Sequence, residues 1–321
     1  MKDSYFTKRI RQDKQALETY TRAIEWDPVR LSRAMSSTGL PHEDVYLETP
    51  NQKLIDHLST FILNAGTNFF FILGPNGFGK SSIKDFSLLV FKDINQYVSF
   101  SLDNIGPITT FQMLREIYLN MTGLEKAPRT RGELKDAIVN HLITTRSNEK
   151  LPITTIVWID EGQKLTSEKL EALRMIADTR TLKGDFTCKF IIVGTEGLKT
   201  KIANWMTTHD EEGMAVMDRG SQFTYDLNPW DEQHIFNWWT LLTEYCSINQ
   251  STDMINPFQP VTAKIVHKLS EGKPRDIVQL SQLALLARAD KYLTDPKNGW
   301  TVRPDDIMDA LGIKQTAEKK K

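Results

Sequence analysis

The sequence predicts an α/β fold in which five parallel strands form one sheet with helices on both faces, flanked by helical segments at both ends. Three observations lead to this fold class. An apolar run, Phe69 to Leu73, ends in a glycine-rich loop that a helical pattern follows at once. Another β-prone run, which is the third predicted strand in chain order, starts at Ile153 and ends on two acidic residues. From Asp231 onward the apolar residues recur at helical spacing, so a separate helical region should follow the sheet.

The loop after the first strand fits the pattern G-x-x-x-x-G-K-[ST] from Gly74 to Ser81. Glycines at Gly74, Gly77 and Gly79 permit backbone angles that a side chain forbids, so successive N–H groups can turn inward on a phosphate chain. The helix starting near Lys80 adds unpaired N–H donors and the positive end of its dipole. We therefore predict that Lys80 contacts the β and γ phosphates of ATP and that Ser81 ligates Mg²⁺. The predicted binding residues are Gly74, Pro75, Asn76, Gly77, Phe78, Gly79, Lys80, Ser81 and Ser82.

The third predicted strand ends on Asp160 and Glu161. Ligands of a parallel α/β sheet bind at the carboxyl ends of its strands. Asp160 is therefore predicted to hold Mg²⁺, usually through water, because this ion keeps most of its hydration shell. Glu161 is predicted to orient, or take a proton from, the water that attacks the γ phosphate. The alternative, a strand followed by a polar turn, is disfavoured by the phosphate loop upstream.

Composition places the chain among ordinary globular proteins: 40% of its 321 residues are hydrophobic and 25% are charged. No apolar run approaches the length that crosses a bilayer, and the basic N-terminus lacks the apolar segment of a secretory signal. Cys188 and Cys246 make neither a disulfide framework nor a metal-binding spacing. We expect a cytoplasmic protein. The formal net charge of −1 gives no global basic field, so any DNA contact must come from a local stripe.

The remaining elements divide the chain into four expected parts. Further strands are predicted at Tyr97 to Leu102, Lys189 to Val193 and Phe223 to Leu227, with helices at Asn51 to Asn64, Ile108 to Met121, Gly132 to Arg146 and Ser167 to Arg180. The expected parts are an N-terminal helical arm (1–46), a nucleotide-binding α/β domain (47–227), a helical lid (228–312) and a disordered basic tail (313–321). The arm holds many cations, and we predict an amphipathic helix pair lying on the core, with contact to DNA or a partner as the alternative. The lid helices are expected at Asp231 to Tyr245, Thr262 to Ser270, Pro274 to Tyr292 and Pro304 to Leu311.

Three further residues are predicted to respond to the nucleotide. Thr195 lies at the tip of the fourth strand, where its hydroxyl can sense the γ phosphate, although it is also placed to cap the next helix. Arg219 precedes the fifth strand and is a candidate arginine finger for a neighbouring subunit, with a surface salt bridge as the alternative. Arg275 lies in the first turn of a lid helix, where acidic residues are favoured over cations. We therefore predict that Arg275 reaches the nucleotide, so that ATP hydrolysis moves the lid.

These motifs resemble those of the AAA+ ATPases over roughly Leu47 to Leu311. The matching stretches are GPNGFGKS as Walker A, IVWIDE as Walker B, Thr195 as sensor one, Arg219 as finger and Arg275 as sensor two. DEGQKL, IIVGTEGL, DLNPW and the GKPRDIVQLSQLALLARA helix are similar to the branch that holds the transposition regulators TniB and TnsC and the secretion ATPase ExeA. The resemblance implies homo-oligomeric rings or filaments that assemble on double-stranded DNA with ATP and recruit a transposase.

Basic and polar residues after the second strand are candidates for binding the DNA backbone: Thr109, Thr110, Arg129 and Arg131. ExeA-type proteins usually continue into a membrane segment and origin-recognition initiators into a winged-helix domain, and we expect neither in the residues after Leu311. Two alternatives stay open. One is a regulatory or defence NTPase that acts on a protein partner without DNA, which the net charge favours. The other is a replication initiator or helicase loader.

Overall fold

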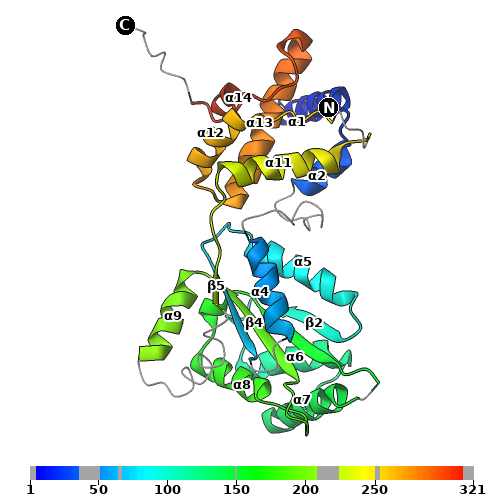
Figure 1. Ribbon diagram of the computed structural model, residues 1–321, viewed down its shortest axis with the longest axis vertical. Helices are drawn as coiled ribbons and strands as arrows, with labels where there is room; N and C mark the ends of the chain where they lie inside the picture. The colour runs from blue at the N-terminus through cyan, green and yellow to red at the C-terminus, as the bar shows by residue number, and fades with distance from the viewer. Residues whose placement is uncertain are drawn as a thin grey trace. The chain divides into compact units, whose positions relative to one another are not determined.

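The computed structural model of this chain describes residues 5–35, 51–63, 67–148, 150–207, 224–249 and 254–313 (Figure 1). The chain forms two compact units. The α/β unit runs from Lys53 to Asn228, and the helical unit combines Met1–Gln52 with Pro229–Lys321. Among the described helices, none is both long enough and apolar enough to cross a membrane.

The α/β unit contains one five-stranded parallel sheet with the strand order β2-β3-β4-β1-β5, which confirms the predicted fold class. The strands are β1 (Phe69–Leu73), β2 (Tyr97–Leu102), β3 (Thr154–Ile159), β4 (Cys188–Gly194) and β5 (Thr224–Asp226). Every residue of β1, β3 and β4 is buried, as expected for strands covered on both faces. Strand β1 is an interior strand with β4 on one side and β5 on the other, so the loop that follows it lies within the sheet's carboxyl edge and not at its end.

Helices cover both faces of this sheet. Side chains of β1 alternate between the faces, with Phe69 and Phe71 on one and Phe70 on the other. The first face packs against α6 (Thr110–Thr122), α7 (Arg131–Arg146), α8 (Ser167–Ala177) and α9 (Glu196–Thr207). On the second face, Phe61 of α4 (Gln52–Leu63) contacts the Phe70 ring at 5.3 Å, and α5 (Lys80–Lys92) packs on β2. The expected double coverage is therefore present.

Helix α8 ends three residues before the predicted boundary at Arg180. After Ala177 the chain turns back on itself, and Arg180 forms an isolated antiparallel bridge with Phe186. The Arg180 guanidinium stacks 3.9 Å from the centre of the Phe186 ring, and Gly184 takes the positive φ of +88° that the turn requires. Tertiary contacts of this turn with β4 end the helix earlier than the sequence pattern indicates.

The helical unit contains α1 (Tyr5–Ala23), α2 (Pro28–Ala34), α11 (Glu232–Cys246), α12 (Pro260–Ser270), α13 (Pro274–Thr294) and α14 (Pro304–Ala310). Its core joins N-terminal side chains such as Tyr20 and Trp26 to Trp239, Phe258 and Ile277 of the C-terminal helices. The indole of Trp239 stacks on Phe258 with ring centres 4.2 Å apart. The N-terminal helices, expected as a separate arm, thus share one core with the lid helices. Arg219, the tail after Ile313 and residues 36–50 lie outside the described residues.

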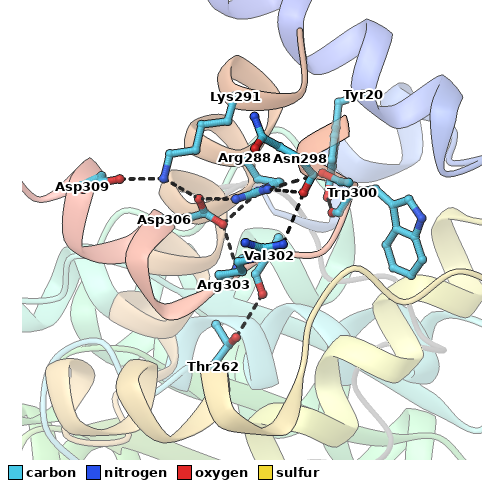
Figure 2. Close-up of polar contacts among 11 residues, drawn as sticks. Tyr20, Thr262, Arg288, Lys291, Asn298, Trp300, Val302, Arg303, Asp306 and Asp309 are labelled. Carbon is cyan, nitrogen blue, oxygen red and sulfur yellow. Dashed lines mark hydrogen bonds and ion pairs between the residues drawn. The ribbon is translucent and has the colours of Figure 1, made fainter. Parts of the chain in front are cut away.

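A buried ionic cluster holds the end of this helical unit together (Figure 2). Asp306 of α14, fully buried, accepts hydrogen bonds from Arg288 Nε (3.0 Å) and Nη2 (2.9 Å), from Lys291 Nζ (2.8 Å) and from the Arg303 N–H (2.7 Å). Burial alone would raise the pKa of Asp306, but these donors outweigh it and lower the pKa below its ordinary value. The Tyr20 hydroxyl donates to the Trp300 carbonyl, so α1 is also tied to this end of the unit.

In the α/β unit, Lys189 of β4 is a buried cation that is 4% exposed. Its Nζ donates to the carbonyls of Phe61 and Thr67, both at 2.8 Å, and lies 4.6 Å from the Phe61 ring centre. The ammonium thereby satisfies a carbonyl in the last turn of α4. Burial, with help from the charge of Arg146, lowers the pKa of Lys189 to about 8.

We expect the stability of the protein, measured relative to Lys189→Met, to rise between pH 8 and pH 10. The pKa is about 8 in the folded protein and near 10.5 in the unfolded chain, so the unfolded chain binds more protons in this window and stability increases with pH. The gain should be about 1 to 3 kcal/mol. Urea unfolding of both proteins at several pH values measures it, since the variant cancels other titrating groups. A difference that stays constant with pH would show that Lys189 keeps its ordinary pKa.

Candidate functional site

The loop between β1 and α5 depends on its glycines. Gly77 and Gly79 have φ angles of +87° and +82°, in the left-handed region that side chains rarely adopt. A Cβ at Gly74 would lie 3.1 Å from the Cβ of Leu227, which follows β5. Phe78 is 7% exposed and anchors the loop in the core. The conformation of the loop therefore depends on glycines at the positions where it turns or packs closely, and on the buried side chain of Phe78.

Lys80 begins α5 directly after Gly79, which caps the helix without a side-chain hydrogen bond. The Lys80 Nζ donates to the carbonyl oxygens of Gly74 and Pro75, both at 2.7 Å. The ammonium is thus folded over the same loop whose N–H groups are predicted to bind phosphate. A helix N-terminus combined with a half-buried ammonium favours an anion at this place.

The ends of β1 and β3 meet through Ser81 and Asp160. The Ser81 Oγ donates to the Asp160 Oδ2 at 3.4 Å, although the two residues are 79 positions apart in the chain. Strands β1 and β3 both pair in parallel with β4, which lies between them, so their carboxyl ends lie at the same edge of the sheet. A hydroxyl and a carboxylate are the hard oxygen ligands that Mg²⁺ prefers, and the phosphates and water would complete its shell. The residues present therefore fit the predicted metal.

Glu161 has an unusual backbone conformation. Its φ of +56° and ψ of +40° are left-handed, which costs a non-glycine residue roughly 1 kcal/mol or more. Its N–H donates to the Asp160 Oδ1 at 2.8 Å, and its carboxylate Oε2 pairs with Lys164 Nζ at 2.6 Å. A Cβ at the next residue, Gly162, would lie 2.4 Å from Ile192 Cγ2. Close packing against β4 thus fixes the turn that presents the Glu161 side chain.

Gln163 is a site residue that the sequence analysis did not single out. It lies in the short 3-10 turn η1 (Gly162–Lys164), and its Oε1 accepts a hydrogen bond from the N–H of Thr195 at 3.2 Å. This contact joins the turn after β3 to the tip of β4, where Thr195 is predicted to sense the γ phosphate. The only signal in the sequence is its position two residues after Glu161.

Lys84 is a second residue that the sequence analysis missed. It lies on α5, is 6% exposed, and its Nζ is 2.6 Å from Asp103 Oδ1, 3.7 Å from Asp85 Oδ1 and 4.0 Å from Asp160 Oδ2. Burial alone would lower the pKa of Lys84, but the hydrogen bond to Asp103 and the three carboxylate charges outweigh it and raise the pKa. A charged ammonium therefore stands beside the predicted metal ligand.

Several of the other candidates are buried or have structural partners of their own. Thr109 caps α6, with its hydroxyl accepting from the Gln112 N–H at 3.2 Å, and Thr110 is buried. Arg131 pairs with Glu168 at 2.6 Å, and Arg129 is exposed. Arg275 occupies the first turn of α13, exposed, in the helical unit. Its role toward the nucleotide stays a prediction, as does that of Arg219.

Comparisons with known proteins agree with the geometry. Residues 64–202 match the family described as AAA domain. A sequence search of curated proteins found no match. Among solved structures, Cdc6p from Pyrobaculum aerophilum is similar with a TM-score of 0.57 and 15% identity, over 88% of this chain and 70% of that one. The Aeropyrum pernix ORC1 protein in complex with DNA has a TM-score of 0.54 and 12% identity, over 87% and 68%.

The Drosophila ORC bound to DNA is similar at a TM-score of 0.53 and 12% identity, over 88% of this chain and 64% of that chain, which is less than two thirds of its length. At these identities the likeness concerns the fold. The chain therefore has the AAA+ type of P-loop fold, and its residues 64–202 are similar to the AAA domain family.

Proposed function

We propose that this protein is an ATP hydrolase, converting ATP and water to ADP and phosphate. The observation that carries the proposal is the convergence of Ser81, after the phosphate loop, with Asp160 at the end of β3. The loop N–H groups and Lys80 would bind the phosphates, Ser81 and Asp160 would hold Mg²⁺, and Glu161 would orient the attacking water. When bound, Mg²⁺ neutralises the charge that develops on the phosphate oxygens.

The chain's own residues then perform three tasks. Lys80 exchanges its carbonyl partners, Gly74 and Pro75, for phosphate oxygens, which keeps the ammonium hydrogen-bonded throughout. Glu161 presents the carboxylate oxygen that does not face Lys164 to the attacking water. Thr195 is held at the tip of β4 by Gln163 and reports the state of the γ phosphate to the turn after β3.

The finer proposal is that the ATPase forms homo-oligomers on double-stranded DNA, in the cytoplasm, and regulates transposition by recruiting a transposase. It is supported by the resemblance of the DEGQKL and DLNPW stretches to the TniB and TnsC branch. Arg219 would act in a neighbouring subunit's site and Arg275 in its own. Since Thr109 caps α6 and Thr110 is buried, the proposed DNA contact in this region falls on Arg129 and Arg131.

A second candidate function is that of a replication initiator or helicase loader. The specific observation that favours it is the fold similarity to Cdc6p and to two origin-recognition proteins whose structures contain DNA. A transposase gene beside the gene for this protein would favour transposition, and a helicase gene would favour loading. A regulatory NTPase that acts on a protein partner is the third candidate, favoured by the net charge of −1.

DNA binding is expected to require ATP and to weaken with salt. Fluorescence anisotropy of a labelled duplex, titrated with protein in ATP, ADP or no nucleotide, measures both dependences. Replacing Arg129 and Arg131 by Gln should lower the affinity about tenfold and the salt slope by about 2, because each phosphate contact releases about one counterion. Lys183→Gln, at an exposed cation in the turn before β4, is the matched control and should change neither. Absence of ATP-dependent binding at low salt would leave only the protein-partner function.

A further inference from the structure

The Lys84 ammonium is shared between a carboxylate of the predicted metal site and one outside it. It lies 2.6 Å from Asp103 Oδ1 and 4.0 Å from Asp160 Oδ2, the oxygen that also accepts from Ser81. Asp103 follows β2 directly, whereas Asp160 follows β3, the neighbouring strand. The cation thus lies between the ends of two adjacent strands. It is closer to Asp103, which is not a predicted metal ligand, than to Asp160, which is.

The burial of Lys84 determines how strongly its charge acts on the neighbouring carboxylates. The Lys84 side chain is 7% exposed, so its charge is poorly screened and must be balanced by carboxylates within reach. Asp103 is 61% exposed and Asp160 is 20% exposed. An ammonium that moved onto Asp160 Oδ2 would occupy the oxygen predicted to face the metal and would repel a divalent cation there.

We propose that Asp103, acting through Lys84, sets the affinity of the nucleotide site for Mg²⁺. By pairing with Lys84, Asp103 holds the ammonium away from Asp160 and leaves the Asp160 carboxylate to the metal. Asp103 is therefore a positioning residue. Asp85, whose Oδ1 is 3.7 Å from the same ammonium, is a weaker partner. The proposal rests on the ATP and Mg²⁺ site proposed above and adds the residue pair that tunes it.

The test is the Mg²⁺ concentration that half-saturates binding of a fluorescent ATP analogue. Asp103→Asn should raise this concentration about five- to tenfold, because the buried Lys84 ammonium is then left with Asp85 and Asp160 as its carboxylate partners and competes with the metal for Asp160. Asp103→Glu keeps the charge and should stay within twofold of the wild type. Asp226→Asn is the matched control: Asp226 is 59% exposed, pairs with Lys199 at 3.0 Å and is not among the predicted nucleotide or metal ligands, so its change should have no effect.

Lys84→Met separates the proposed route from a direct effect of the Asp103 charge. In the Lys84→Met background, Asp103→Asn should change the half-saturating Mg²⁺ concentration by less than twofold, because no ammonium remains to be redirected. An equal shift with and without Lys84 would overturn the proposal, as would an unchanged value in Asp103→Asn alone. Thermal unfolding of each variant checks that it is folded. If the wild type binds no nucleotide with Mg²⁺, the proposed ATPase function fails, whereas normal wild-type binding without these shifts overturns only the role of Asp103.

Discussion

Glu161→Gln is expected to bind ATP with nearly wild-type affinity and to hydrolyse it at least about 100-fold more slowly, the range typical of losing a positioned general base. Glutamine has almost the same shape and tolerates the same left-handed backbone, so the turn after β3 should keep its fold. The amide cannot accept a proton from the attacking water, and it also loses the ion pair with Lys164. Steady-state phosphate release and equilibrium nucleotide binding, measured on the same preparation, separate the two effects.

Two further variants serve as controls for this measurement. Lys80→Ala should lose nucleotide binding itself, because the phosphates lose the ammonium that now bridges the Gly74 and Pro75 carbonyls. Glu125→Gln, at an exposed acid in the loop before α7, should leave binding and turnover unchanged. Wild-type turnover in Glu161→Gln would remove Glu161 from the catalytic role, and undiminished ATP binding in Lys80→Ala would remove the phosphate loop from the site.

Arg288→Met should lower the free energy of unfolding of the helical unit by about 3 kcal/mol. The substitution leaves Asp306, which is fully buried, without its two guanidinium hydrogen bonds, and an unpaired buried charge typically costs about 3 to 5 kcal/mol. Lys291 Nζ and the Arg303 N–H still donate to Asp306, so the lower end of that range applies. Urea unfolding at pH 7, followed by the tryptophan fluorescence of the helical core, measures the loss.

A double variant distinguishes the cost of the unpaired Asp306 charge from the cost of lost Arg288 packing. Replacing both partners, Arg288→Met with Asp306→Leu, should recover a large part of the stability, because a buried ion pair is often replaced by apolar residues at little cost. Asp309→Asn, which removes an exposed partner of Lys291, should cost less than about 1 kcal/mol. A double variant as unstable as Arg288→Met alone would show that the packing of Arg288, and not the unpaired Asp306, accounts for the loss.

Local patterns predicted most of the α/β unit. The run from Phe69 to Leu73 is a strand at those bounds, and Tyr97 to Leu102 is another, because strands buried on both faces or half-buried leave a clear trace in residue type. Helix boundaries were less accurate. Helix α12 begins at Pro260 and not at Thr262, because proline fits the first turn of a helix, where its missing N–H is not needed.

Long-range contacts account for what sequence patterns did not predict. Lys84 looks like an ordinary helix cation beside Ile83, yet the ends of β2 and β3 enclose it with carboxylates. The N-terminal helices were predicted as an amphipathic arm lying on the core, yet Ala16 and Tyr20 of α1 and the following Ile24 are part of one core with the C-terminal helices. Gln163 becomes informative only once β4 lies beside the turn that contains it. In each case the partner is far away in the chain, so no local period reveals it.

The sequence by itself determined the five strands, the glycine-dependent loop and the acidic pair, because backbone preferences and alternating burial are encoded in neighbouring residues. Only the tertiary structure decided that Ser81 meets Asp160, that Lys84 is shared with Asp103, and that both ends of the chain build one helical core. The physical reason is the parallel sheet order β2-β3-β4-β1-β5, which brings separated strand ends to one edge and is itself set by packing across the whole chain.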